Sequence, residues 1–158
     1  MNLRLLAGAF LVYEHEVLLL HRGLHKELAP GMWSCIGGHM ESNELNNPLA
    51  TCYREVEEET GIPKSAIENL ALRYITTRKT GNETRIVFYY FGKTSHRCCL
   101  SECNEGELSW TSLDDMPNLP MSFSVKEISN HWLKNQDSDI VMLCGINKEN
   151  DAVSWVEL

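Results

Sequence analysis

The chain has 158 residues, of which 43% are hydrophobic, and its formal net charge is −8. This length and composition suffice to bury one sizeable core, so we expect a single domain over residues 1–158. The acidic balance argues against an extended surface for polymeric nucleic acid or an anionic membrane and favours small-molecule partners. No apolar run approaches the roughly 20 residues of a membrane span and no signal peptide is recognisable, so we expect a soluble, cytoplasmic protein.

The N-terminal region predicts two neighbouring strands, residues 3–13 and 17–21, separated by a short polar turn. Arg22 ends the second of them. A loop and a short strand, residues 32–36, then lead to a turn at Gly37 and Gly38. Glycine allows the backbone to approach a metal ion or a phosphate closely, so this turn is a candidate part of a site.

A helix is indicated over residues 48–60. Asn47 is a favourable N-cap, Pro48 suits the first helical position, and Gly61 followed by Pro63 is a stop signal.

Three glutamates of this helix, Glu55, Glu58 and Glu59, stand at i, i+3 and i+4 and should converge on one spot. They repel one another, and they lie in the last turns, where the helix dipole disfavours negative charge. For the three residues alone, a solvated acidic face is the ordinary interpretation. A hard divalent cation such as Mg²⁺ or Mn²⁺ would remove the repulsion, and the neighbouring Arg54 could orient a carboxylate.

The glycines and carboxylates together resemble the Nudix box, G-x5-E-x7-R-E-U-x-E-E-x-G-U with U aliphatic, of the Nudix (MutT-like) hydrolases. Gly38 and Glu44 match its first part, and the second part is matched by Arg54, Glu55, Val56, Glu58, Glu59, Gly61 and Ile62. The chain departs from the pattern between Glu44 and Arg54, where nine residues replace seven. We place the surplus in a loop before the helix, across which Glu44 must reach back.

The resemblance implies the Nudix fold, an α/β/α sandwich with a mixed sheet between helices, where the pattern alone indicates only α+β. It also implies metal ligands at the Gly38 carbonyl, Glu55, Glu58 and Glu59, with Mg²⁺ or Mn²⁺ as the cofactor. In the family a basic residue at the position of Arg22 often faces the nucleotide; a surface arginine at a strand end is the alternative.

Beyond the helix, residues 67–77 and 85–92 predict two strands joined by a polar hairpin at 78–84. The apolar run 86–91 suggests a central, buried strand. Arg78 and Arg85 are candidate phosphate contacts, although each alone is also compatible with a solvent-facing position.

A second family feature is the segment from Glu105 to Trp110, which resembles the E-G-E-x-x-W motif of many Nudix hydrolases. In the family a glutamate of this loop is a further metal ligand or a general base. We assign that role first to Glu105 and second to Glu107, which could instead begin the following strand.

The C-terminal part predicts an amphipathic helix over residues 123–135 and a hairpin of strands 139–146 and 152–157. We interpret residues 139–158 as an extension of the domain that lengthens the sheet or forms a homodimer. The loose group His96, Cys98, Cys99 and Cys103 fits no standard zinc spacing, so we expect reduced thiols there.

The resemblance implies metal-dependent hydrolysis of a nucleoside diphosphate linked to another group, with nucleoside triphosphates, including oxidised ones, as the leading substrates. Glu55, Glu58, Arg54 and Glu105 are the expected catalytic residues. ADP-ribose or a nucleotide sugar is the alternative substrate. A non-catalytic ligand sensor and an isopentenyl-diphosphate isomerase-like enzyme using Cys35 are the alternative classes; the complete set of box glutamates favours the hydrolase.

Overall fold

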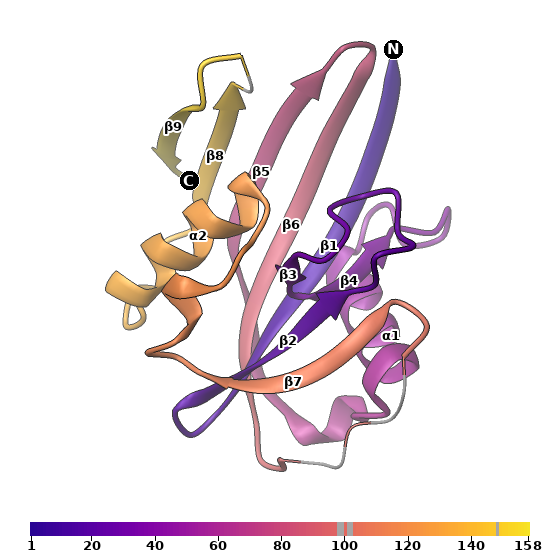
Figure 1. The fold of residues 1–158 in the computed structure, drawn as a ribbon, viewed down its shortest axis with the longest axis vertical. Helices are drawn as coiled ribbons and strands as arrows, with labels where there is room; N and C mark the ends of the chain where they lie inside the picture. The colour runs from indigo at the N-terminus through magenta and orange to yellow at the C-terminus, as the bar shows by residue number, and fades with distance from the viewer. Residues whose placement is uncertain (98–99, 101–102, 148) are drawn as a thin grey trace.

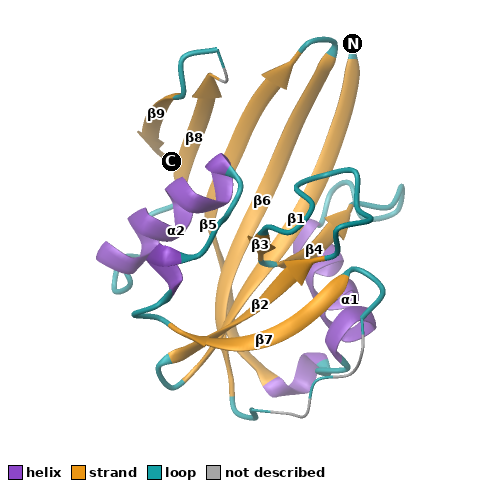
Figure 2. Cartoon of the chain, in the orientation of Figure 1, coloured by secondary structure: helices purple, strands orange, loops and turns teal. Residues whose placement is uncertain are grey.

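The computed structural model describes residues 1–97, 100, 103–147 and 149–158. Cys98 and Cys99, considered above for zinc, lie outside the described residues. Figure 1 and Figure 2 show a twisted sheet with a helix on each side. The elements are β1 (Asn2–Tyr13), β2 (Glu16–Arg22), β3 (Trp33–Ser34), β4 (Ile36–His39), α1 (Pro48–Thr60), β5 (Ile67–Thr80), β6 (Glu83–Thr94), β7 (Gly106–Ser112), α2 (Phe123–Lys134), β8 (Met142–Asn147) and β9 (Ala152–Glu157).

The sheet is mixed and runs in the order β3-β2-β1-β6-β5-β8-β9, with β4 added to β1 and β7 added to β2. The pairs β1–β6 and β5–β8 are parallel and the remaining pairs are antiparallel. The strand expected to be central, β6, lies in the middle of this order. Among the described residues, no helix is long and apolar enough to cross a membrane.

Successive side chains of a strand point to opposite faces of the sheet, and the apolar ones form two cores, one on each face. On β1, Ala9 and Leu11 belong to the core that includes Val56 of α1. Phe10, which lies between them, belongs to the core that includes Ile128 and Trp132 of α2. The two helices therefore cover opposite faces, which confirms the sandwich expected from the family resemblance.

The helix α1 begins at Pro48 and ends at Thr60, as the sequence predicted. Gly61 ends it in the left-handed conformation, with φ 76°, which glycine adopts without strain. Asn47 occupies the N-cap position without making a side-chain capping hydrogen bond.

Two predictions about loops were wrong. Gly37 and Gly38 lie within β4, where they pair with Gly8 and Ala7 of β1, and they do not form a turn. The polar hairpin expected at 78–84 is shorter, because β5 continues to Thr80 and β6 already begins at Glu83. Pairing in the sheet gives the backbone N–H and C=O groups of these polar residues the hydrogen bonds that water would otherwise provide in an exposed loop.

The C-terminal hairpin extends the sheet, because β8 pairs with β5 and β9 pairs with β8. Trp155 of β9 stacks on His131 of α2 with ring centroids 4.7 Å apart and meets Tyr74 of β5 edge-on. These aromatic contacts attach the hairpin to the α2 face.

Candidate active site

A cavity of about 770 Å³ opens on the α2 face of the sheet, and this volume is in the range that accepts a nucleotide-sized ligand. Its walls come from β1, β4, β5 and β6, from the loop between β2 and β3, from the end of α1 and from the start of α2. One end is lined by carboxylates, including Glu55, Glu59 and Glu105. Arginines from three strands, Arg22, Arg78 and Arg85, also line it.

The two glycines of β4 allow the carboxylate end to close. A Cβ atom on Gly37 would collide with the backbone carbonyl of Ala7, so β4 could not lie against β1 in this register. A Cβ atom on Gly38 would stand 2.5 Å from Oε1 of Glu55. Glycine at position 38 therefore lets the Glu55 carboxylate rest directly on the backbone of β4.

Arg54 organises the carboxylates around it. Its Nε and Nη2 donate to the two carboxylate oxygens of Glu44 at 2.8 and 3.0 Å, a bidentate pair. Its Nη1 donates to Oε1 of Glu55 at 2.7 Å, and Nη2 also donates to the His39 carbonyl at 3.1 Å. One guanidinium thus ties α1 to β4 and fixes the position of Glu55.

Glu44 crosses the longer loop without losing its contact to the helix. It is 6% exposed, and besides Arg54 it accepts hydrogen bonds from the Thr51 hydroxyl at 2.8 Å and the Glu41 backbone N–H at 2.9 Å. These donors hold the pKa of Glu44 at about 2, below its usual 4.5. Residues 45–47 lie between Glu44 and the start of α1 at Pro48, and the contact of Glu44 with Arg54 spans this longer connection.

The three glutamates of α1 do not converge as expected. Successive helical residues are rotated by about 100°, so Glu58 and Glu59 point in different directions. The side chain of Glu58 is 59% exposed and turns toward Arg54 Nη1 at 3.3 Å, whereas Glu59 is buried. In the described part of the chain, no three His, Cys, Asp or Glu side chains come together as a ready-made metal site.

Glu59 is the unusual group of the site. Burial raises its pKa most, and the negative charges of Glu55 and Glu105 raise it further, to about 8. Its Oε2 is buried and has no hydrogen-bond partner among the described residues. An unpaired carboxylate oxygen between two other carboxylates is well suited to a hard divalent cation, so the donor set fits a metal.

The segment after β6 brings one of its two glutamates to the cavity. Glu105 lines the carboxylate end, where its charge is felt by Glu59, and it pairs with Lys26 Nζ at 2.8 Å. Glu107 lies one residue inside β7 opposite His21, is exposed, and is not among the residues lining the cavity. This geometry favours Glu105 over Glu107 as the loop carboxylate.

Some cavity residues were not anticipated from the sequence. Ser122 and Ser124, at the start of α2, line the wall, although that helix was expected only to cover the sheet. Lys26 as partner of Glu105 was also missed. Neither contact leaves a signal in the sequence, because spacing along the chain does not show which distant segments meet.

Comparisons with known proteins agree with this geometry. The family model of the NUDIX domain matches residues 2–136. The uncharacterized Nudix hydrolase YvcI of Bacillus subtilis is 31% identical over 128 residues, covering 78% of this chain and 75% of that protein.

Solved structures extend the similarity to the fold. The MutT protein of Bacillus halodurans superposes with a TM-score of 0.72 and 26% identity, covering 98% of this chain and 97% of that chain. The NUDIX domain of NrtR from Shewanella oneidensis, solved with ADP-ribose, has a TM-score of 0.63 and 19% identity, covering 86% of this chain and 88% of that chain. The latter similarity shows a shared fold.

The sandwich, the glycine strand and the carboxylate-rich end of α1 together define a class of enzyme, hydrolases of pyrophosphate bonds that generally use divalent metal ions. The chain belongs to the Nudix family, whose members hydrolyse nucleoside diphosphates linked to another group. The β8–β9 hairpin lies beyond the residues matched by the family model.

Proposed function

We propose that this Nudix hydrolase cleaves nucleoside or deoxynucleoside triphosphates, oxidised ones included, to the monophosphate and pyrophosphate, with Mg²⁺ or Mn²⁺ as cofactor. The observation that carries the proposal is the buried, unpartnered Oε2 of Glu59 at one end of a cavity that also presents Arg22, Arg78 and Arg85. A cation fits the first feature and a polyphosphate fits the second.

Glu55, Glu58, Glu59, Glu105 and the Gly38 carbonyl are the groups that would hold the metal. Bound there, a divalent ion supplies Lewis-acid stabilisation of the diphosphate and lowers the pKa of a water molecule. Glu58 has to turn inward from its present contact with Arg54 to take part, and a rotamer change of an exposed side chain achieves this.

The protein groups position the substrate and move the proton. Arg54 keeps Glu55 against β4, and the arginines of the cavity orient the phosphate chain. Glu105, or Glu58 after turning inward, accepts the proton of the attacking water. Lys26 Nζ lies 2.8 Å from Glu105 and holds this carboxylate beside the cavity.

The proposal is tested by turnover of a substrate panel with Mg²⁺ or Mn²⁺. The panel holds ordinary and oxidised nucleoside triphosphates, ADP-ribose, nucleotide sugars and dinucleotide cofactors. We expect metal-dependent release of a nucleoside monophosphate from a triphosphate, and its loss in Glu59→Gln. Stronger turnover of ADP-ribose or a nucleotide sugar would replace the proposed substrate. No turnover by folded, metal-binding protein would favour a ligand sensor.

A further inference from the structure

Three arginines on neighbouring strands form one row on the cavity side of the sheet. Arg4 of β1 stands directly opposite Arg85 of β6, and Arg85 stands directly opposite Arg78 of β5. Residues paired in this way project to the same face, and neighbouring strands lie only about 4.8 Å apart. We call Arg4, Arg85 and Arg78 the arginine row; none of the motifs of the sequence contains it.

The row carries more positive charge than its surroundings neutralise. Glu83 is shared by two members, since it lies 2.7 Å from Arg4 Nε and 2.6 Å from Arg85 Nη2. Arg78 has no carboxylate within ion-pair distance among the residues that the structure describes, and its Nε donates only to the Thr80 hydroxyl at 3.3 Å. Like charges directly opposite one another destabilise a sheet, so a further anion bound at the row would stabilise this arrangement.

One donor of the row also lacks a partner. Nε of Arg85 is buried and makes no hydrogen bond within the described part of the chain, and a buried donor left unpaired is costly. Arg85 and Arg78 both line the cavity, so a ligand there could accept from them. Charge and hydrogen bonding therefore both indicate a bound anion at the row.

The position of the row shows which part of a substrate it would meet. Ala7 of β1 pairs with Gly38, against which Glu55 lies, and Arg4 precedes Ala7 by three residues. At roughly 3.3 Å per residue the row stands about 10 Å from the carboxylate end. This separation is too large for two directly linked phosphates, but arginine side chains reach toward the cavity and can meet the end of a longer chain.

We propose that the arginine row binds a terminal phosphate of the substrate and selects for nucleoside diphosphate derivatives that carry one. A phosphate monoester is dianionic near neutral pH, and guanidinium groups match its oxygens in a bidentate manner. The inference rests on the proposed function in that the phosphate belongs to the hydrolysed compound. The phosphate is either the end of a triphosphate or a monoester on the ribose, whereas a neutral sugar offers neither.

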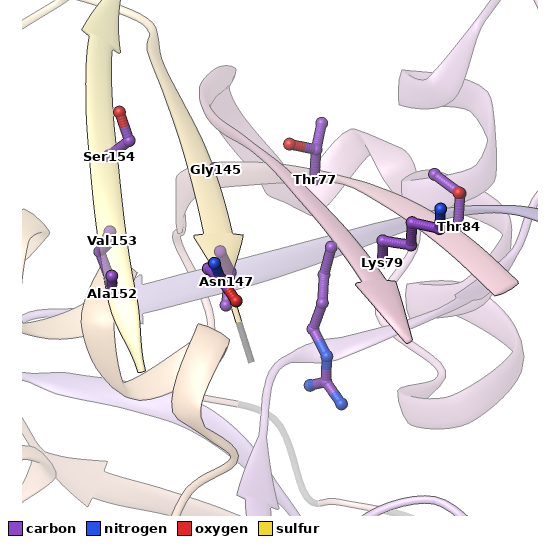
Figure 3. Close-up of a pocket in the computed structure, with 10 residues that line it drawn as sticks. Thr77, Lys79, Thr84, Gly145, Asn147, Ala152, Val153 and Ser154 are labelled. Atoms are coloured by element: carbon purple, nitrogen blue, oxygen red, sulfur yellow. The ribbon is translucent and has the colours of Figure 1, made fainter. Parts of the chain in front are cut away.

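Lys79 provides a matched control. It follows Arg78 on β5, and alternation along a strand assigns neighbouring residues to opposite faces. Lys79 borders a shallow hollow of about 540 Å³ with Thr77, Asn147 and Ser154 (Figure 3). Arg78 also contributes to the rim of this hollow. Lys79→Gln therefore removes one positive charge beside Arg78 in sequence without removing a member of the row.

The first test is binding to metal-free protein, measured by titration calorimetry, so that hydrolysis plays no part. GTP is compared with GDP-mannose, which has the same nucleoside diphosphate but no terminal phosphate. NADPH is compared with NADH, which lacks the phosphate monoester on the adenosine ribose. Inorganic triphosphate serves as a probe without a base. We expect Arg4→Gln, Arg78→Gln and Arg85→Gln each to weaken binding of the phosphate-terminated compounds at least about tenfold, because each removes a charge-assisted hydrogen bond.

In the same titrations GDP-mannose and NADH should bind these variants as they bind the wild type, and Lys79→Gln should change nothing. If the wild type binds GTP more tightly than GDP-mannose, the row binds the end of a triphosphate. If it binds NADPH more tightly than NADH, the row binds a phosphate monoester on the ribose. The proposal is overturned if the wild type prefers neither phosphate-terminated compound and fails to bind triphosphate, or if all three substitutions leave the preference intact. Arg85→Lys, which keeps the charge, replaces Arg85→Gln should that variant not fold.

Turnover of the same compounds with Mg²⁺ separates this inference from the proposed function. Phosphate-dependent binding without hydrolysis would reject the proposed function alone. Hydrolysis that is equally fast with and without the terminal phosphate, and equally fast in Arg78→Gln, would reject the arginine row alone.

Discussion

The two ends of the cavity are built in opposite ways. At the carboxylate end Arg54 is surrounded by carboxylates, and Oε2 of Glu59 has no hydrogen-bond partner in the described part of the chain. At the other end a single carboxylate, Glu83, is shared by two arginines, and Arg78 has no ion-pair partner within the described ranges. Among the described residues, one end therefore gathers carboxylates and the other gathers arginines, and each keeps a side chain without a counter-ion or hydrogen-bond partner.

This difference indicates which kind of ligand the cavity is suited to bind. A divalent cation bound to a polyphosphate carries positive charge at the metal and negative charge along the chain. Such a complex would neutralise both ends at once. The carboxylate end is also the more extensively hydrogen-bonded of the two, since Glu44 and Arg54 form a bidentate ion pair and make three further hydrogen bonds with Thr51, Glu41 and His39.

The largest expected effect comes from removing a carboxylate at the acidic end. Glu58→Gln and Glu59→Gln should each lower kcat by roughly 10²–10⁴-fold, because each removes a metal ligand or a base. Glu57→Gln is the matched control, since Glu57 is exposed on another side of the same helix. Steady-state kinetics with saturating Mg²⁺ measures the effect. Wild-type turnover by Glu58→Gln would show that Glu58 stays with Arg54 and has no part in the reaction.

A smaller effect, on folding stability, should distinguish the carboxylate end from the arginine row. Glu44→Gln should lower the free energy of unfolding at pH 7 by roughly 3 kcal/mol, the value that corresponds to a pKa lowered from 4.5 to about 2. Glu83→Gln should cost less than about 1 kcal/mol, because its ion pairs are partly exposed to solvent. Urea denaturation of both variants gives the comparison.

The pH dependence of the stability loss in Glu44→Gln shows whether the ion pair with Arg54 causes it. A lowered pKa means that the stabilisation from the Glu44 carboxylate is fully present above about pH 4.5 and is lost as the pH falls through about 2. The difference between wild type and Glu44→Gln should therefore shrink over this interval. A difference that is constant with pH would show that packing, and not the ion pair with Arg54, is responsible.

The smallest expected effect is the proton released when metal binds. Because the pKa of Glu59 is raised to about 8, its carboxyl group is mostly protonated at pH 7 and must lose the proton to become a ligand. Mg²⁺ affinity should rise about tenfold per pH unit below pH 8 and level off above it. Calorimetry at pH 7 in two buffers with different heats of ionisation counts the proton. Binding without proton release would contradict this assignment, and Glu59→Gln should release none.

The comparison also shows how far the sequence could be read. The carboxylate end lies within one stretch of chain, so its parts are visible as a motif: Gly38, Glu44, Arg54 and the three glutamates. The arginine row is assembled from Arg4, Arg78 and Arg85, which are far apart in the chain. Strand register alone brings these three residues together, and no local pattern marks it.

Even within the motif, the sequence did not fix the orientation of each side chain. Helical spacing placed Glu55, Glu58 and Glu59 on one face, but the contact with Arg54 turned Glu58 outward and burial drew Glu59 inward. The glycine pair was expected to form a turn, whereas the approach of β4 to β1 made it part of a strand. For the glycine pair the deciding neighbour, β1, is distant in sequence, whereas for Glu58 it is Arg54 on the same helix.

The sequence by itself determined the α1 helix with its ends, most strands, the class of fold and the identity of the carboxylates, because local propensity and motif spacing act over short stretches of chain. Only the tertiary structure decided that Glu44 still reaches Arg54, that Glu105 and not Glu107 borders the cavity, and that three arginines form one row. Those outcomes depend on burial and strand pairing between remote segments, and these exist only once the chain has folded.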